Sequence, residues 1–158
     1  MKLAIASDHA GFPLKSNLIQ WLVEELGLTA TDLGPSSSDS VDYPDFAGYL
    51  CRHLLEGKAE RGILICNSGI GMSMSANRYP DIRAALCLFP GMAYYARHHK
   101  NANVLILGGG VTAPFLAREI IEVFLREEFD EGRHSRRTGK IESVSQTDTL
   151  NQRGKIND

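Results

Sequence analysis

A cysteine ends a short apolar run, Gly62 to Cys66, and a glycine-punctuated loop, Asn67 to Gly71, follows it directly. An apolar run of this length predicts a buried strand that carries the thiol to its carboxyl end. Helical character resumes from Met72 to Asn77. The N–H groups of the loop can therefore converge on an anion at a helix N-terminus. A thiolate beside such donors can take a proton from carbon and stabilise the resulting enolate. The alternative is a buried structural cysteine before a tight strand-to-helix turn.

Two further polar pairs could assist such chemistry. Asp8 and His9 follow the apolar run Leu3 to Ala6 after a single serine, Ser7. At that place they could handle a sugar hydroxyl and a phosphate. The alternative for Asp8 is a simple helix N-cap. His98 and His99 close a helical segment. Because neighbouring helical residues point about 100° apart, at most one of these histidines faces a site. His99 could act as an acid or base near neutral pH. The alternative is a favourable interaction with the helix C-terminus.

A basic cluster near the C-terminus contains Arg133, His134, Arg136 and Arg137. Arg133 and Arg137 are four residues apart, so on a helix they share one face. Such a pair could fork around a phosphate group. The alternative is an ordinary solvated surface.

Several familiar site types are excluded by spacing. No P-loop pattern follows the cysteine strand. The first arginine after Cys66 is Arg78, too far for the phosphate-binding arginine expected of a cysteine phosphatase. The run Gly108 to Gly110 lacks the dinucleotide-binding pattern. The three cysteines include no CxxC pair, which indicates neither a zinc site nor a disulfide framework. Free thiols favour a reducing compartment, so we expect a cytoplasmic protein.

The bulk composition is that of an ordinary globular domain. The chain has 158 residues, is 43% hydrophobic and 23% charged, and carries a formal net charge of −2. This balance gives no reason to expect nucleic-acid or membrane partners. The N-terminal apolar run is too short for a signal peptide, and no run is long enough to cross a membrane.

Apolar runs alternate with amphipathic segments along the chain. The predicted strands are Leu3–Ala6, Leu28–Leu33, Gly62–Cys66, Ile82–Leu88 and Val104–Leu107. The predicted helices are Pro13–Leu26, Asp45–Leu55, Met72–Asn77, Gly91–His99 and Ala113–Phe129. This order predicts an α/β fold, a single domain with a five-stranded parallel sheet flanked by helices. Ligands of such sheets bind at the carboxyl ends of the strands, near a topological switch point. We expect the domain to span residues 1–144 and residues 145–158 to form a flexible tail.

Taken together, several motifs resemble ribose-5-phosphate isomerase B, a family grouped with the galactose-6-phosphate isomerase subunits. The resemblance runs in order from about residue 2 to residue 141. The motifs are Ser7–Gly11, Val41–Pro44, Gly62–Ser73, Ser75–Asn77, Ile82–Ala84, Asn103–Val104 and Gly132–His134.

The resemblance implies a Rossmann-like homodimer, or a dimer of dimers, with active sites at the subunit interface. It implies no metal and no organic cofactor. The reaction would be aldose–ketose interconversion of a phosphorylated sugar through a cis-enediolate, with ribose 5-phosphate and ribulose 5-phosphate as the first expectation. That reaction belongs to carbohydrate metabolism, in the pentose phosphate pathway.

The resemblance also implies roles for individual residues. Cys66 matches the base that moves a proton between C2 and C1, and the backbone of Asn67, Gly69, Ile70 and Gly71 matches the anion hole. Asp8, Ser68 and His99 match the residues associated with opening the sugar ring. Tyr43 matches a residue that lines the site. His9, Arg133 and Arg137 match phosphate ligands.

Three positions depart from the family pattern. Lys100 stands where many relatives have asparagine, Gly110 where they often have a phosphate-binding arginine, and Asn67 where glycine is more usual. Lys100 or Arg136 could supply the charge that Gly110 lacks. The departures keep two alternatives open. One is an isomerase of another sugar phosphate, such as a six-carbon allose or galactose phosphate. The other is a sugar-phosphate binding protein without catalytic activity.

Overall fold

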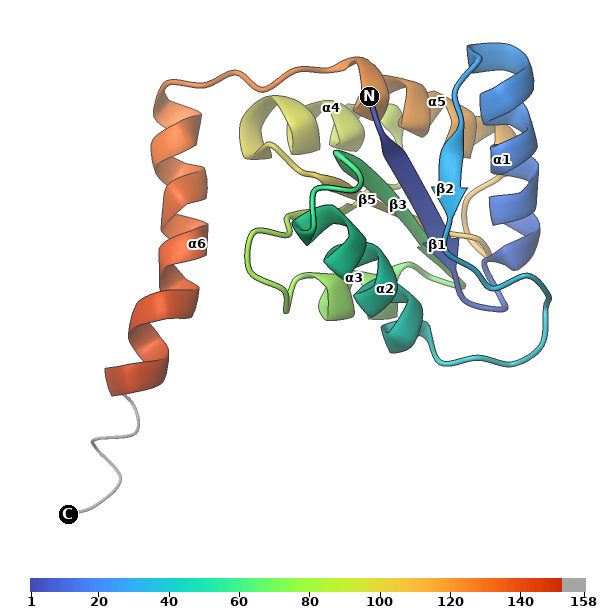
Figure 1. Ribbon diagram of the computed structural model, residues 1–158. Coiled ribbons are helices and arrows are strands. Elements are labelled where there is room, and N and C mark those ends of the chain that lie inside the picture. The colour runs from blue at the N-terminus through green and yellow to red at the C-terminus, as the bar shows by residue number, and fades with distance from the viewer. Residues whose placement is uncertain (152–158) are drawn as a thin grey trace.

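The computed structural model describes the backbone of residues 1–151 and the side chains of residues 1–143. Strands and helices alternate through most of the chain (Figure 1). The strands are β1 (Leu3–Ser7), β2 (Ala30–Asp32), β3 (Arg61–Cys66), β4 (Ala84–Leu86) and β5 (Val104–Gly108). The helices are α1 (Phe12–Leu26), α2 (Tyr43–Leu55), α3 (Ile70–Ala76), α4 (Pro90–Lys100), α5 (Pro114–Arg126) and α6 (Arg133–Asn151).

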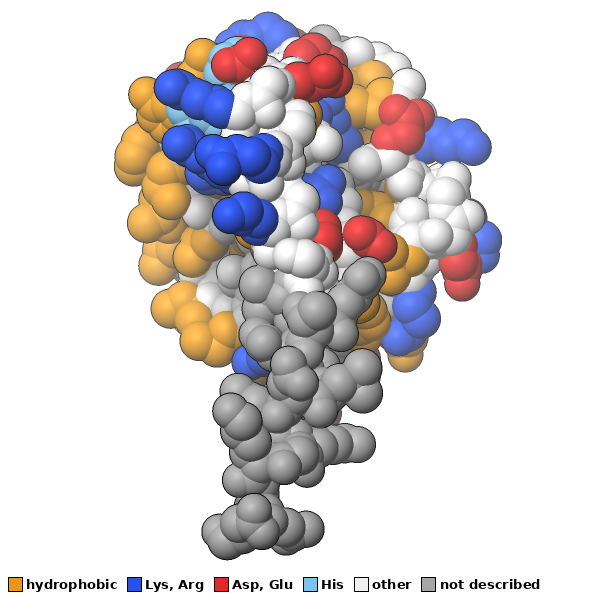
Figure 2. Space-filling view, turned by 90° about the vertical axis from the view of Figure 1, so that its left-hand side faces the viewer, with side chains coloured by type: hydrophobic (Ala, Val, Ile, Leu, Met, Phe, Trp, Pro, Cys, Tyr) orange, Lys and Arg blue, Asp and Glu red, His pale blue; other side chains and the backbone are white. Residues whose placement is uncertain are grey.

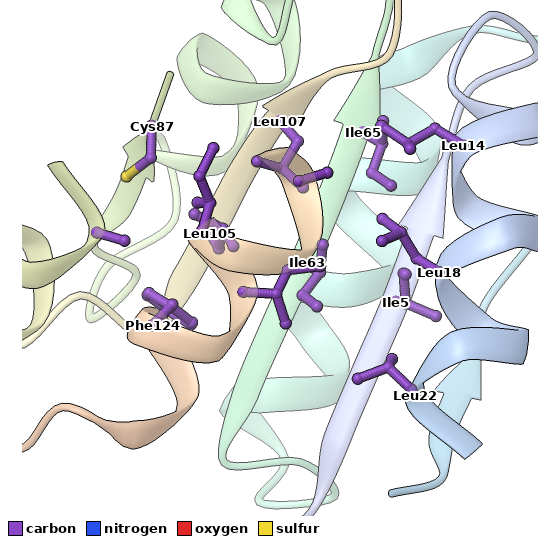
Figure 3. Close-up of a cluster of buried hydrophobic side chains, with 14 of the residues drawn as sticks. Ile5, Leu14, Leu18, Leu22, Ile63, Ile65, Cys87, Leu105, Leu107 and Phe124 are labelled. Atoms are coloured by element: carbon purple, nitrogen blue, oxygen red, sulfur yellow. The ribbon is translucent and has the colours of Figure 1, made fainter. Parts of the chain in front are cut away.

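The sheet separates two hydrophobic cores. Successive strand residues point to opposite faces, so in β3 Ile63 and Ile65 pack with α1, α4 and α5, whereas Leu64 and Cys66 pack with α2 and α3. Figure 3 shows the first of these cores, where Leu18 of α1 and Phe124 of α5 approach the strands. Cys66 therefore ends its strand on the face that α2 and α3 cover.

The described strands are parallel and lie in the order β2-β1-β3-β5-β4. The predicted α/β class with a five-stranded parallel sheet is confirmed. The chain leaves β1 toward one edge of the sheet and returns through α2 to β3, from which it continues toward the other edge. The topological switch point therefore lies between β1 and β3, and ligands of doubly wound sheets bind at this point, beyond the carboxyl ends of the strands.

Helix α5 ends at Arg126, three residues before the predicted end at Phe129. The guanidinium of Arg61 donates hydrogen bonds to the carbonyls of Phe124 and Leu125, both at 2.6 Å. Arg97 Nε donates to the carbonyl of Glu127 at 3.3 Å. Side-chain donors thus satisfy carbonyls that a longer helix would have used, and the chain turns away. Burial lowers the pKa of Arg97 to about 10, which still leaves the side chain charged at neutral pH.

Helix α6 is an element that the sequence analysis did not predict. It contacts α4 and runs down one side of the molecule (Figure 1). Arg83 Nη1 donates to Glu142 Oε1 at 2.7 Å, which ties α6 to the start of β4. The helix continues through Ser145, the expected domain boundary, to Asn151. The remainder of the expected tail, residues 152–158, lies outside the described residues.

Candidate active site

Cys66 lies at the carboxyl end of β3, and only 5% of its surface is exposed. The backbone N–H of Gly69 donates to its Sγ at 3.2 Å. Gly69 has a φ of 78°, in the left-handed region that glycine adopts at little cost. This conformation turns the loop back on the strand so that its amide faces the sulfur. The sulfur therefore has a backbone donor directed at it from the loop that follows the strand.

Ser68 and Ile70 close the same loop. Ser68 Oγ accepts a hydrogen bond from the N–H of Ile70 at 3.3 Å. The following helix α3 starts at Ile70, as the glycine pattern indicated, although two residues earlier than predicted. The loop therefore presents one hydroxyl, one thiol and consecutive backbone amides within a few residues.

Asp8 stands beside this loop across the switch point. Its backbone N–H donates to the carbonyl of Ile65 at 3.0 Å, which places it next to the end of β3. Its Oδ1 accepts a hydrogen bond from the N–H of Gly11 at 2.8 Å, just before α1. Among the described residues Oδ2 has no hydrogen-bond partner. Asp8 thus orients the entry to α1 with one oxygen and leaves the other for a ligand, and only 7% of the residue is exposed.

His9 and Tyr43 border the same region from the α2 side. His9 Nδ1 lies 3.2 Å from both the backbone N and the backbone O of Val41. This contact orients the imidazole and leaves Nε2 as the atom available to a ligand. Tyr43 begins α2, and a β-carbon at Gly71 would lie 2.8 Å from its ring. The glycine therefore allows the tyrosine to lie against the first turn of α3.

The loops after β3 and β5 are joined by their backbones. Gly109 N–H donates to the carbonyl of Cys66 at 2.7 Å, and Gly110 N–H donates to that of Asn67 at 2.8 Å. These bonds extend the pairing of β3 with β5 beyond its last register pair, Cys66 with Gly108. Asn67 is held directly above the carboxyl edge as a result, with its side chain exposed.

A second group of predicted site residues lies around the end of α4 and the start of α6. The rings of His99 and His134 stack with centroids 4.2 Å apart and planes only 6° apart. Tyr95, one turn earlier in α4, packs against His99, with the two ring centroids 5.0 Å apart. Burial, followed by His99 and Arg133, lowers the pKa of His134. The stack thus joins His99 of α4 to His134 of α6.

Arg133 and Arg137 are exposed and four residues apart on α6. Figure 2 shows Lys and Arg side chains gathered on this side of the molecule beside a histidine. The exposed basic residues of α6 in this part are Arg133, Arg136, Arg137 and Lys140. Because no acidic partner is found for them among the described residues, the patch presents a net positive charge to solvent.

One chain does not bring the two groups together. Cys66 pairs with Gly108 at the carboxyl end of β5, whereas His99 ends a helix that leads directly into the start of β5 at Val104. From Val104 to Gly108 the strand advances by about 13 Å. The two groups therefore lie at opposite ends of the strands.

His134 is the contact that sequence reasoning missed. In the sequence it belongs to the basic cluster and to the motif Gly132–His134, neither of which predicts burial, yet only 3% of it is exposed. Its burial depends on how α6 folds back onto α4, which no local pattern encodes. Tyr95 could have been found, because it precedes His99 by four residues on the same helix face.

The described part of the chain contains neither a cluster of metal ligands nor a membrane-spanning helix. No group of three or more His, Cys, Asp or Glu side chains there is placed to hold a metal ion. None of the described helices is both long and apolar enough to cross a membrane.

Comparison with known proteins identifies the family. The sequence profile described as ribose/galactose isomerase matches residues 3–141. The chain belongs to this family. The ribose-5-phosphate isomerase B of Escherichia coli is 37% identical over 145 residues, covering 92% of this chain and 97% of the relative. The D-erythrulose-4-phosphate isomerase of Pectobacterium atrosepticum is 40% identical over 143 residues, covering 89% and 93%.

A solved structure from this ribose/galactose isomerase family has the same fold. The crystal structure of a ribose 5-phosphate isomerase from Thermotoga maritima is 50% identical in sequence and superposes with a TM-score of 0.88. The match covers 90% of this chain and 98% of that one. The resemblance inferred from the motifs is confirmed, and the protein is a sugar-phosphate isomerase of the aldose–ketose type.

Proposed function

We propose that the protein interconverts ribose 5-phosphate and ribulose 5-phosphate through a cis-enediolate, with Cys66 as the base. The observation that carries this proposal is the thiol at the switch point, 3.2 Å from the N–H of Gly69 and beside the buried Asp8. A C–H next to a carbonyl is a weak acid, so a base needs hydrogen-bond donors for the developing oxyanion. Each strong, preorganised donor contributes about 3–4 kcal/mol to such a transition state.

In this mechanism Cys66 takes the proton from C2 of the open-chain aldose and returns it to C1. The electron pair of the C2–H bond forms the C1–C2 double bond and places negative charge on O1. The proton of the O2 hydroxyl passes to O1, and protonation of C1 then leaves the carbonyl at C2. The backbone of residues 67–71 supplies donors to the enediolate oxygens. Because the sugar is mostly a closed ring, an acid and a base must first open it. Asp8 and His99, with the hydroxyl of Ser68, are the groups proposed for that step.

The proposal requires two copies of the chain. His99, Arg133 and Arg137 lie near the amino end of β5, whereas Cys66 lies at the carboxyl end of β3, which supports their coming from a partner in any one site. We therefore propose a homodimer, or a dimer of dimers, in which the basic patch of one copy binds the phosphate of a sugar held at the other copy's switch point. In this proposal His9 contributes to the phosphate site from the thiol's own chain, and Tyr43 borders the same site.

Ribose 5-phosphate is preferred as substrate because the Escherichia coli and Thermotoga maritima relatives bear that name. The Pectobacterium relative is named for a four-carbon sugar phosphate, so chain length must be tested rather than assumed. The experiment incubates the purified protein with ribose 5-phosphate without added metal and follows ribulose 5-phosphate. Cys66→Ala is assayed alongside, with Cys87→Ala as the control that removes a different buried thiol.

We expect turnover by the wild type and by Cys87→Ala, and a fall in kcat of about 10²–10⁴-fold for Cys66→Ala. Circular dichroism should report the same fold for all three proteins. Near-normal kcat in the Cys66 variant would exclude the thiol as the base. A folded wild type that turns over a different sugar phosphate but not ribose 5-phosphate would move the proposal to that substrate.

A further inference from the structure

Asn67 and Gly110 compete for one volume beside the thiol. A β-carbon built at Gly110 would lie 2.2 Å from Oδ1 of Asn67 and 3.1 Å from its Cγ. Real β-carbons do not approach a side chain this closely, so any side chain at position 110 would displace the carboxamide. The backbone hydrogen bond from Gly110 N–H to the carbonyl of Asn67, at 2.8 Å, fixes the two residues in this relation.

This shared volume borders the proposed reaction centre. Asn67 directly follows Cys66, and Gly110 lies two residues beyond Gly108, the register partner of Cys66. The Asn67 side chain is exposed at the carboxyl edge, and within the described residues its amide has no hydrogen-bond partner. A carboxamide there offers a donor and an acceptor to a ligand but no charge.

We propose that Asn67 is the specificity-determining residue of this site and limits the carbon-chain length of the sugar phosphate. The inference rests on the proposed isomerase function. The carboxamide fills space that one more hydroxymethylene unit of a longer sugar would need. Its neutral amide can hydrogen-bond a sugar hydroxyl, and Gly110 is required because it leaves that space to Asn67.

The test measures kcat/KM for erythrose 4-phosphate, ribose 5-phosphate and allose 6-phosphate. The variants are Asn67→Gly, which empties the volume, and Asn67→Asp, which keeps the volume and adds charge. Asn67→Gly should raise the six-carbon to five-carbon ratio of kcat/KM by about tenfold or more, the usual effect of one carbon unit in a fitted pocket. Asn67→Asp should lower kcat/KM for all three anionic substrates and leave their ratios near the wild-type values.

Gly110→Ala, alone and combined with Asn67→Gly, tests the shared volume without reference to activity. The single variant should lower the melting temperature, and the double variant should recover most of the loss. If the double variant did not recover the melting temperature, the claim that the side chains at positions 67 and 110 share one space would be wrong.

The kinetic outcomes separate the two proposals. An equal fall in kcat/KM for all three sugars in Asn67→Gly would overturn the specificity role while leaving the isomerase function intact. If Asn67→Asp changed the six-carbon to five-carbon ratio of kcat/KM as much as Asn67→Gly does, side-chain volume would not be the cause. A wild type inactive on all three sugars would contradict the proposed function itself, and the specificity role with it.

Discussion

Cys66 and His99 lie at opposite ends of the strands of one parallel sheet. The thiol ends β3, whereas the histidine ends a helix that leads into the start of β5, the strand beside β3. A reaction that needs both groups at one sugar must draw them from two chains. Under the proposed mechanism, the interface between copies would be part of the catalytic machinery and not merely a source of stability.

Mixing two inactive variants should therefore restore activity. In a heterodimer of Cys66→Ala and His99→Ala, one of the two sites contains an intact thiol and an intact histidine. Random exchange of subunits at equal amounts should recover about a quarter of wild-type activity. The measurement is ribulose 5-phosphate formation after the variants are unfolded and refolded together. The control is each variant refolded alone, and a mixture no more active than the controls would argue for a site within one chain.

Iodoacetamide should modify Cys66 well before the other two cysteines. Burial raises the pKa of Cys51 and of Cys87 to about 12, so their reactive thiolates are scarce near pH 8. Cys66 instead has the Gly69 N–H directed at its sulfur. Peptide mass spectrometry over time should find label on Cys66 in step with loss of activity. Label on Cys51 or Cys87 at the same rate, in folded protein, would contradict this expectation.

Arg137→Ala should raise KM for ribose 5-phosphate by about tenfold or more and change kcat little. A phosphate contact remote from the reacting carbons stabilises the ground state and the transition state equally. Steady-state kinetics at constant ionic strength provide the measurement. Arg126→Ala is the matched control, because Arg126 is also an exposed arginine, paired with Glu127 on α5. An unchanged KM in Arg137→Ala would remove this residue from the phosphate site.

The unfolding free energy should fall as the pH drops below about 7, in part through His134. Its pKa in the folded protein is lowered, chiefly by burial and then by His99 and Arg133, while Asp130 opposes the shift. The unfolded chain then takes up a proton near the ordinary histidine pKa of about 6.5, before the folded chain does. This stability contribution is present above that value and is lost as the pH falls through the folded pKa.

Urea unfolding between pH 8 and pH 5.5 measures the effect. The slope of unfolding free energy against pH should be smaller in His134→Gln than in the wild type. His53→Gln, which removes a histidine from α2, is the control. Equal slopes in the two variants would mean that His134 does not carry the dependence.

The carboxyl-edge half of the site was predictable from the sequence, because parallel strands deliver their ends to one edge. Cys66, Asp8 and the loop after β3 follow from that rule. The stack of His99 on His134 was not predictable, since it depends on how α6 folds onto α4. The early end of α5 had no local signal either, because its carbonyls are taken by Arg61, a residue 63 positions away from Phe124.

Asn67 and Gly110 illustrate the same limit. Each residue was visible in the sequence as a departure from the family pattern. That the two are one feature emerged only from the 2.2 Å approach of a β-carbon at position 110 to the Asn67 carboxamide. Contacts between loops that lie far apart in sequence are set by strand register, which the periodicity of the sequence does not predict.

Two arginines from other elements, Arg61 and Arg97, bind the C-terminus of α5 and so fix where the following segment begins. Arg61 and Arg97 hold the last carbonyls of α5, and the N–H of Asp130 is bonded to the carbonyl of His98 at 2.9 Å. The chain from there to Arg133 is a short spacer between anchored ends. One residue added or removed would shift the arginine pair by up to about 3.5 Å, more than a hydrogen bond tolerates. The number of residues in this spacer therefore sets where Arg133 and Arg137 stand in the proposed phosphate site, and it matters there as much as the identity of any side chain.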